Sequence, residues 1–301
     1  MVVSGLTGVF GFPVTPFKQD LSLDLPALER NVDAMTQHPF CAIVAAGGAG
    51  ELYSLTPDEV EQVVRVTVQA TAGRMPIIAG TGYNAAIGAD IVRRAEKAGA
   101  DGILALPPYY TNAPEAGLFA YYEAIGRASG LPLLLYSRDW AVFTPLQVAQ
   151  LAERVPTLAG WKDGQGAPRK YRRIMNEVGD RLAWFGGLGD DSVPEYFAIG
   201  VQAYTSSISN IAPRISVALA KAGMAHDLPR MHEIMDRYVH PLFALRERVK
   251  GYEVAVMKLA MEMLGMPAGP VRPPLCEVRP QDVEDLRKII AVYQESKSST
   301  I

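Results

Sequence analysis

Cysteine and histidine are scarce in this sequence, and their scarcity argues against two kinds of stabilising site. The two cysteines, Cys41 and Cys276, are too few for a disulfide framework. None of the histidines has a compact spacing with cysteine or carboxylate that would indicate a metal site. The four histidines are His38, His226, His232 and His240. We therefore expect neither a disulfide scaffold nor a bound metal.

Long apolar runs and an excess of basic residues are also missing. No apolar run reaches the roughly 18 residues that a membrane-spanning helix needs. The first five residues lack a basic region followed by an apolar region, so we expect no signal peptide. The net charge of -3 and the pI near 5.9 argue against a nucleic-acid surface. We expect a cytoplasmic protein with neither membrane nor nucleic-acid partners.

Apolar segments do occur in number, and they alternate with amphipathic segments along the chain. The apolar segments show little internal alternation, which is typical of parallel strands buried on both faces. We predict strands over residues 8–17, 41–46, 76–82, 102–107, 131–137, 158–162, 182–187 and 202–207. We predict helices between them over residues 24–37, 56–72, 84–98, 114–129, 145–154, 168–178, 192–199 and 213–222.

Eight strand–helix units of this length predict an α/β fold, a (β/α)8 TIM barrel. A doubly wound open sheet is the alternative, but no glycine-rich dinucleotide fingerprint follows the first strand. We assign residues 1–225 to the barrel and residues 226–301 to a C-terminal helical region. That region is predicted to contain three helices, over residues 228–249, 252–264 and 280–296.

Lys162 is the first candidate for chemistry. It is the only one of nine lysines that falls in a predicted strand. Burial disfavours the charged ammonium and lowers the pKa of a lysine. A neutral amine in a dry pocket can attack a ketone. The alternative is that Lys162 ends the strand or pairs with Asp163.

Other candidates follow from the rule that the active site of such a barrel lies at the C-terminal ends of the strands. Tyr136 ends the strand that neighbours Lys162, and a phenol there can move protons. The alternative for Tyr136 is simple packing under a loop. Gly48, Ala49 and Gly50 follow the second strand, and small residues let backbone N–H groups approach a carboxylate. An ordinary tight turn is the alternative for that loop.

Arg138 is a candidate clamp for a second carboxylate, because its guanidinium can bind in a bidentate manner. A salt bridge with Asp139 in the same loop is the alternative. A phosphate site at residues 186–189 is disfavoured, because Asp190 and Asp191 follow at once and would repel the phosphate. No predicted strand ends supply the histidine and carboxylate set of a metal-dependent aldolase.

The ordered motifs resemble the dihydrodipicolinate synthase/N-acetylneuraminate lyase family of Schiff-base barrel enzymes over nearly the whole chain. They are Val14-Thr15-Pro16-Phe17, Gly47-Gly48-Ala49-Gly50-Glu51, Ala79-Gly80-Thr81-Gly82, Pro107-Pro108-Tyr109-Tyr110, Leu135-Tyr136 and Gly160-Trp161-Lys162-Asp163-Gly164. The resemblance implies a lyase that needs no cofactor beyond a covalent imine on Lys162. It also implies a small-molecule 2-oxo acid substrate.

The resemblance further implies roles for individual residues. Lys162 would form the imine and Tyr136 would relay protons. The Gly48-Ala49 segment would hold the 2-oxo carboxylate through its amides. Tyr110 stands where the family has a tyrosine that reaches into a neighbouring subunit's site. The family is commonly a homotetramer, built as a dimer of dimers.

Within the family, the chain looks most like the 5-dehydro-4-deoxyglucarate dehydratase branch. Gly48 and Ala49 stand where the synthase and lyase branches usually carry hydroxyl residues. The double glycine, the Tyr-x-Arg-Asp and Lys-Asp-Gly motifs and Val271-Arg272-Pro273-Pro274-Leu275 resemble the dehydratases, although Ala49 replaces a threonine and Ser137 an asparagine of that branch.

The expected reaction is therefore a decarboxylating dehydration in sugar-acid breakdown, from 5-dehydro-4-deoxyglucarate to 2,5-dioxopentanoate, water and carbon dioxide. The second carboxylate of this substrate would contact Arg138 together with Ser207, Ser209 or Asn210. One alternative is an aldolase for 2-oxo-3-deoxy sugar acids, or a dihydrodipicolinate synthase-like lyase. Another is a catalytically idle paralogue that binds a sugar acid.

Overall fold

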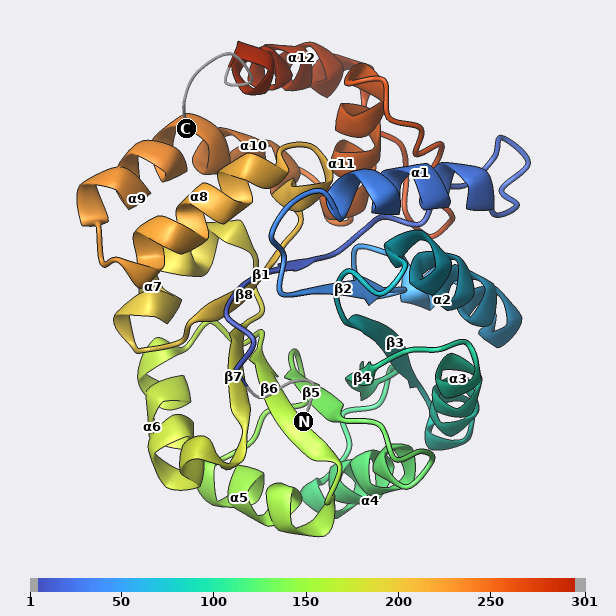
Figure 1. The fold of residues 1–301 in the computed structure, drawn as a ribbon, viewed down its shortest axis with the longest axis vertical. Coiled ribbons are helices and arrows are strands. Elements are labelled where there is room, and N and C mark those ends of the chain that lie inside the picture. Colours follow the sequence, from blue (N-terminus) through green and yellow to red (C-terminus); the bar gives the residue numbers. More distant parts are fainter. Residues whose placement is uncertain (1–4, 296–301) are drawn as a thin grey trace.

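The computed structural model describes residues 5–295. The N-terminal residues 1–4 and the last residue predicted to be helical, Ser296, lie outside this described part. Eight parallel strands close into a barrel in the order of the sequence, and helices surround it (Figure 1). The predicted (β/α)8 barrel is confirmed.

The strands are shorter than predicted at the start of the chain. Predicted strand 8–17 ends at Gly11, because Pro13 and Pro16 have no N–H to donate to a sheet. Beyond that point Phe17 forms only an isolated bridge with Leu23. The strands are β1 (Gly8–Gly11), β2 (Ala42–Ala45), β3 (Ile77–Tyr83), β4 (Gly102–Pro108), β5 (Leu133–Ser137), β6 (Leu158–Asp163), β7 (Ala183–Gly186) and β8 (Ala203–Ser206).

The barrel helices begin at caps that the sequence encodes. Thr56 and Glu59 form a reciprocal capping box before α2, and Thr144 and Gln147 do the same before α5. The helices are α1 (Leu25–Met35), α2 (Pro57–Thr71), α3 (Ala85–Lys97), α4 (Glu115–Gly126), α5 (Pro145–Arg154), α6 (Pro168–Val178), α7 (Val193–Ala198) and α8 (Pro213–Met224). Short 3-10 turns, η3 (Asp190–Ser192) and η4 (Ile208–Asn210), follow β7 and β8.

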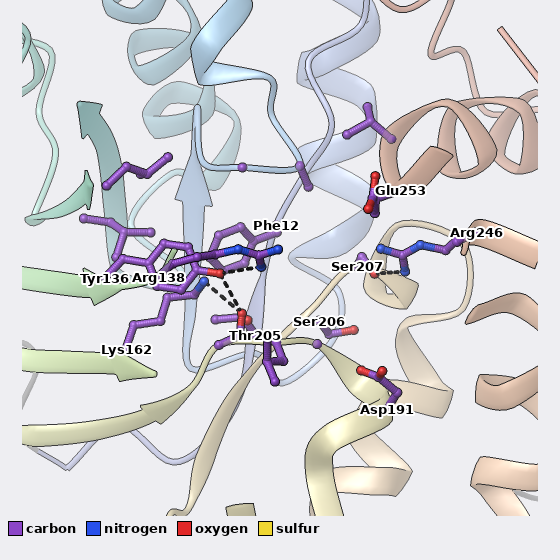
Figure 2. A pocket seen from close by; sticks show the side chains of 18 of the residues that line it. Phe12, Tyr136, Arg138, Lys162, Asp191, Thr205, Ser206, Ser207, Arg246 and Glu253 are labelled. Carbon is purple, nitrogen blue, oxygen red and sulfur yellow. Dashed lines mark hydrogen bonds between the residues drawn. The ribbon is translucent and has the colours of Figure 1, made fainter. Parts of the chain in front are cut away.

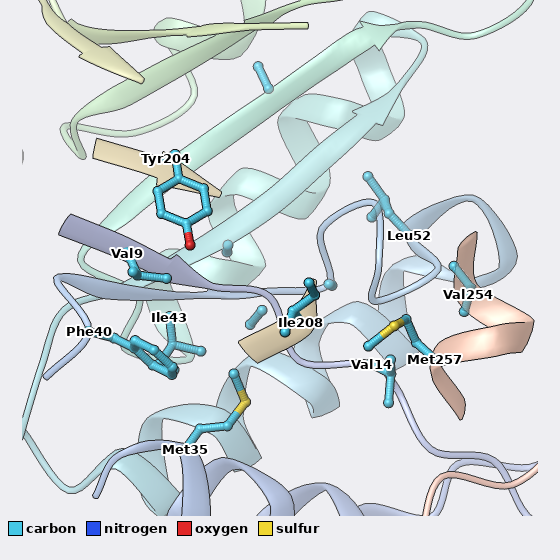
Figure 3. Packing of buried hydrophobic residues seen from close by; sticks show 14 of the residues in the cluster. Val9, Val14, Met35, Phe40, Ile43, Leu52, Tyr204, Ile208, Val254 and Met257 are labelled. Atoms are coloured by element: carbon cyan, nitrogen blue, oxygen red, sulfur yellow. The ribbon is translucent and has the colours of Figure 1, made fainter. Parts of the chain in front are cut away.

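Two apolar clusters hold the strands in place. The inner cluster fills the barrel, where the rings of Phe10 and Phe185 meet edge to face at 4.7 Å. The outer cluster lies between the strands and the helices and extends to the C-terminal region. Figure 3 shows Val254 and Met257 of that region close to Val14 of the barrel. The core is therefore continuous from the barrel into the C-terminal helices.

The C-terminal region forms α9 (Leu228–Ile234), a π-helical segment η5 (Met235–Val239), α10 (His240–Arg246), α11 (Tyr252–Met263) and α12 (Pro280–Glu295). The single helix predicted over residues 228–249 is thus interrupted and ends early. Pro241 has no N–H to donate to the preceding turn, which accounts for the break in regular bonding. No helix in the described part of the chain is long and apolar enough to cross a membrane.

Candidate active site

A cavity of about 540 Å³ lies at the C-terminal ends of the strands. Its wall includes strand-end residues of β5, β6 and β8 together with residues of α10 and α11 (Figure 2). Its main polar and charged side chains belong to Tyr136, Arg138, Asp139, Lys162, Asp191, Thr205, Ser206, Ser207, Arg246, Glu247 and Glu253. This is the end of the barrel at which we expect chemistry.

Lys162 is a buried amine on the wall of this cavity. Only 5% of the residue is exposed, and Nζ donates a hydrogen bond to the Gly187 carbonyl at 3.1 Å. Burial lowers the pKa of Lys162 well below its usual value, and the positive charge of Arg138 lowers it further. Asp163 acts in the opposite direction on the same pKa. The amine is thus disposed to be neutral and nucleophilic.

Tyr136 lies directly beside Lys162, because the two residues are register partners on the parallel strands β5 and β6. The lysine Nζ lies 3.2 Å from the centre of the tyrosine ring. The phenol donates to the Gly187 carbonyl at 3.1 Å and accepts from Nη1 of Arg138 at 3.0 Å. Burial raises the pKa of Tyr136, and Arg138 lowers it. The phenol and the amine therefore share one acceptor and can exchange a proton with the same substrate atom.

Gly187 is part of this arrangement and was not anticipated. Its carbonyl accepts from both Lys162 and Tyr136. A Cβ at Gly187 would lie 2.2 Å from the Asp163 carbonyl oxygen and 2.7 Å from Cγ of Lys162. The glycine run after β7 is visible in the sequence, but a backbone carbonyl as acceptor leaves no signal in the residue types.

The loop after β2 brings Gly48 and Ala49 to the cavity wall. Within residues 5–295, no protein acceptor receives a hydrogen bond from either backbone amide. Unpaired amides beside a cavity are suited to a carboxylate. Gly50 does not line the cavity with them, and its carbonyl instead accepts from Oγ1 of Thr15 at 2.7 Å.

Arg138 lines the cavity, where the predicted contact with Asp139 is present and the predicted clamp on a second carboxylate stays a prediction. Its Nη1 bonds the Tyr136 phenol, and its Nε lies 3.8 Å from Oδ1 of Asp139. The side chain is 44% exposed, so the contact with Asp139 is a weak surface ion pair. Arg138 therefore acts electrostatically on Lys162 and Tyr136 in this geometry.

The opposite wall of the cavity carries a second arginine that sequence reasoning missed. Nη1 of Arg246, the last residue of α10, donates to Oγ of Ser207 at 2.8 Å. Figure 2 shows Arg246, Ser207 and Glu253 on one side, and Lys162 with Tyr136 on the other. The sequence pattern of alternating strands and helices did not indicate Arg246, because α10 follows the eight strand–helix units of the barrel.

Asp190 and Asp191, which follow β7, have different surroundings. Asp190 is buried and accepts from the hydroxyls of Tyr204 and Ser206. Asp191 lines the cavity, and burial together with the charge of Asp190 raises its pKa to about 6. An acidic pair at this position agrees with the argument against a phosphate loop.

Three other predicted site residues lie away from the cavity wall. Oγ of Ser209 donates to the Ser206 carbonyl at 2.7 Å, and Nδ2 of Asn210 donates to the Phe12 carbonyl at 2.8 Å. Their polar atoms therefore tie the end of β8 to its surroundings. Tyr110 is 83% exposed and does not line the cavity of its own chain.

Metal ligands are not grouped in the described part of the chain. No cluster of three or more histidine, cysteine, aspartate or glutamate side chains within residues 5–295 has an arrangement that could hold a metal ion. The polar groups that converge on the cavity are an amine, a phenol, backbone amides, hydroxyls, guanidinium groups and single carboxylates. This set suits covalent imine chemistry on an acidic substrate.

Comparison with known proteins gives one consistent result. The family model described as the dihydrodipicolinate synthetase family matches residues 5–293. A chain from Bradyrhizobium diazoefficiens named a probable 5-dehydro-4-deoxyglucarate dehydratase is 40% identical over 97% of this chain and 94% of its own length. A chain of the same name from Rhizobium rhizogenes is 40% identical over 94% of each chain.

Solved structures give a similar result at lower identity. The dihydrodipicolinate synthase from Bacillus clausii superposes with a TM-score of 0.92 and 27% identity, over 98% of this chain and all of that chain. The enzyme of the same name from Oceanobacillus iheyensis gives a TM-score of 0.91 and 26% identity, over 96% of this chain and 97% of that chain.

Proposed function

Because this chain belongs to the dihydrodipicolinate synthetase family, we propose that it is a Schiff-base enzyme in which Lys162 attacks the ketone of a 2-oxo acid. Its relatives and family make it an enzyme of the lyase class. The observation that carries the proposal is the buried Lys162 amine, which shares the Gly187 carbonyl with Tyr136 at the wall of a cavity. No external cofactor is needed, because the imine itself serves as the electron sink.

The proposed reaction converts 5-dehydro-4-deoxyglucarate to 2,5-dioxopentanoate, water and carbon dioxide. Relatives named as probable dehydratases for this substrate support the choice. Carbons are counted from the 2-oxo end. Nζ adds to the C2 ketone, and the carbinolamine loses the ketone oxygen with two protons as water to give an imine. The imine takes up one proton and becomes an iminium at C2. The iminium acidifies C3, and removal of a C3 proton then expels the C4 hydroxyl, which leaves as water once protonated.

The dehydrated intermediate is an iminium conjugated with the C3–C4 double bond. The electron pair of the C5–C6 bond moves into this conjugated system, and C6 leaves as carbon dioxide. The resulting dienamine takes a proton at C3, and the enol at C5 becomes the aldehyde. Water hydrolyses the imine and releases the product from Lys162. Dehydration comes before decarboxylation, since only the conjugated iminium can accept the electron pair.

The residues around the amine have distinct roles in this proposal. The Tyr136 phenol moves protons to and from the substrate near Lys162. The free amides of Gly48 and Ala49 bind the carboxylate next to the ketone. Arg138 favours the neutral amine and is a candidate contact for the other carboxylate. Ser207 lines the same cavity and stays a candidate contact.

We also propose a homotetrameric, cytoplasmic enzyme that acts on a small-molecule substrate. The side chains of Tyr109 and Tyr110 are 71% and 83% exposed, which suits the predicted insertion of Tyr110 into a neighbouring subunit's site. Sedimentation of the purified chain tests the assembly. A monomer with full activity would contradict a role for Tyr110 across an interface.

Product analysis separates the dehydratase from the aldolase alternative. The diacid is incubated with the enzyme, and carbon dioxide, 2,5-dioxopentanoate and pyruvate are measured. The dehydratase releases equal amounts of carbon dioxide and 2,5-dioxopentanoate, whereas an aldolase releases pyruvate and no carbon dioxide. Lys162→Ala removes the nucleophile, so it should abolish turnover. Normal turnover by this variant would rule out the imine mechanism.

A further inference from the structure

Arg246 is a buried cation that forms no ion pair with a carboxylate in the described part of the chain. It is 9% exposed, and it makes no ion pair within 4.0 Å with any carboxylate of residues 5–295. Nη1 bonds the Ser207 hydroxyl, the guanidinium lies 4.4 Å from the centre of the Phe243 ring, and Nε has no hydrogen-bond partner among the described residues. The cost of desolvating this charge is therefore offset only in part by the protein.

Two other cations that are largely shielded from solvent do have carboxylate partners. Lys258 lies 2.6 Å from Glu51, and Arg272 lies 2.6 Å from Glu59. These pairs follow the general rule that a buried charge is paired or binds a ligand. Arg246 departs from this rule, and it borders the cavity on the side opposite Lys162.

The acidic residues nearest to Arg246 do not supply its partner. Asp190, Asp191 and Glu253 act on the charge from a distance, and none is within ion-pair range. The Asp190 carboxylate is already bonded to Tyr204 and Ser206 and to the amide of Ser207. Oδ1 of Asp191 is buried and has no hydrogen-bond partner among residues 5–295. The guanidinium is thus held in place by Ser207 and the Phe243 ring, and no carboxylate within residues 5–295 pairs with it.

We propose that Arg246, in place of the predicted Arg138 and together with the Ser207 hydroxyl, binds the distal carboxylate of a 2-oxo diacid whose ketone has reacted with Lys162. This inference rests on the proposed function and defines the substrate class of the same site. Arg246 and Lys162 line opposite sides of one cavity, so one extended substrate can contact both (Figure 2). The planar guanidinium fork matches the two oxygens of a carboxylate.

A carboxylate fits this end of the cavity better than a phosphate. Asp191, Glu247 and Glu253 line the same wall and repel a dianion more strongly than a monoanion. In the proposed reaction the distal carboxylate is the group lost as carbon dioxide. Arg246 is therefore a specificity-determining residue that holds this group while the chemistry proceeds at C2 to C5.

Two substrates that differ at the distal end test the inference. Arg246→Met should lower kcat/KM for the diacid by about 100-fold or more, because a charged hydrogen-bonding partner is lost. Reductive trapping of pyruvate on Lys162 should change by less than about twofold, because pyruvate has no distal carboxylate. Arg237→Met is the matched control, since Arg237 is exposed on η5 and does not line the cavity.

Each outcome either supports or contradicts the binding of the distal carboxylate by Arg246. An equal loss with both substrates would assign Arg246 a structural role, and no loss with either would remove it from the site. If Arg246→Met does not fold, Ser207→Ala makes the same test with a smaller expected loss for the diacid. Calorimetric binding of adipate, an unreactive six-carbon diacid, should weaken at least tenfold in the Arg246 variant even if wild-type Lys162 forms no imine. Failure of the proposed function is thereby distinguished from failure of this inference.

Discussion

The pKa of Lys162 is determined by a balance between burial and two charged neighbours. Burial and Arg138 lower it, whereas Asp163 raises it. A lysine whose folded pKa is depressed becomes neutral as pH rises through that lowered value. The rate of imine formation should therefore rise with pH and level off above the pKa of Lys162. Substitutions of Arg138 and Asp163 should therefore shift this pH dependence in opposite directions.

Arg138→Gln removes the positive charge that lowers the pKa of Lys162. The pKa should rise, and the pH at which pyruvate trapping reaches half its maximum rate should move to higher pH. Asp163→Asn removes the charge that raises the pKa, so its profile should move to lower pH. Trapping rates measured across pH for both variants check the signs. Shifts in the same direction would contradict the electrostatic account.

Tyr136→Phe removes the phenol but keeps the ring beside Lys162. We expect kcat to fall about 100-fold or more, which is the usual contribution of a placed proton-transfer group. Borohydride trapping on Lys162 should still occur, because the nucleophile is intact. Tyr121→Phe is the control, since Tyr121 is a buried tyrosine that does not itself line the cavity and whose phenol bonds the Leu106 carbonyl. An unchanged kcat in Tyr136→Phe would remove the phenol from the mechanism.

Residue types and strand ends predicted part of the site but not all of it. Lys162 and Tyr136 could be paired because equivalent ends of neighbouring parallel strands meet at one edge. Gly187 could not be assigned, because it contributes a backbone carbonyl that no residue type reveals. Arg246 bonds Ser207, which lies 39 residues earlier in the chain. The alternation of strands and helices does not predict how the helix that carries Arg246 packs against the barrel.

At the level of elements, the end of β7 depends on a close approach to β6. A Cβ at Gly187 would lie 2.2 Å from the Asp163 carbonyl oxygen, whereas one at Gly48 would meet nothing within 4 Å. Backbone atoms cannot give way as the end of a flexible side chain can. The two loops therefore tolerate an added methyl group very differently.

Gly187→Ala should lower the free energy of unfolding by about 1–3 kcal/mol, because overpacking forces the backbone to shift. It should also slow imine formation, since the carbonyl that orients Lys162 moves. Gly48→Ala should change the free energy of unfolding by less than about 0.5 kcal/mol. Urea unfolding of both variants makes the comparison. Equal stabilities would show that β6 and β7 are less tightly packed than described.

Most helices and strands of the barrel could be predicted, because the spacing of apolar residues and the helix-capping residues indicate the same element at each position. Helices α5 and α6 have the predicted bounds, each beginning with a proline at its first turn. Beyond the barrel, the π-helical segment before Pro241 could not be predicted, because apolar spacing does not distinguish it from a regular helix. The early end of β1 had a visible signal in Pro13 and Pro16 that the apolar run outweighed.

For the whole molecule, the barrel and the C-terminal helices are joined by a buried ion pair. Nζ of Lys258 on α11 lies 2.6 Å from the Glu51 carboxylate, and the side chains are 1% and 0% exposed. Glu51 follows the Gly48-Ala49 loop directly and also accepts from the amide of Arg272. The division at residue 225 remains a prediction, and this contact ties the proposed carboxylate site to the C-terminal region.

Lys258→Met leaves the Glu51 carboxylate buried without its cation. We expect the free energy of unfolding to fall by about 3–5 kcal/mol. Burial already raises the pKa of Glu51, and loss of Lys258 should raise it further. A raised folded pKa gives stability that is lost as pH rises through it, so the deficit should be larger at about pH 8 than at about pH 5.

The double variant Glu51→Gln with Lys258→Met is the matched control for this prediction. It removes both charges, so it should recover most of the stability that the single variant loses and also the difference between the two pH values. Thermal or urea unfolding at both pH values provides the measurement. A single variant as stable as the wild type would mean that the pair does not join the two parts of the molecule.

Borohydride reduction in the presence of substrate, followed by intact mass measurement and peptide mapping, tests the central claim most directly. The account predicts one stable adduct on Lys162 with pyruvate and one with 5-dehydro-4-deoxyglucarate. The mass of the diacid adduct should show the loss of water and carbon dioxide. Lys162→Ala should give no adduct with either compound. Absence of an adduct from the wild-type enzyme, or an adduct on another lysine, would contradict the assignment of Lys162 as the imine-forming residue.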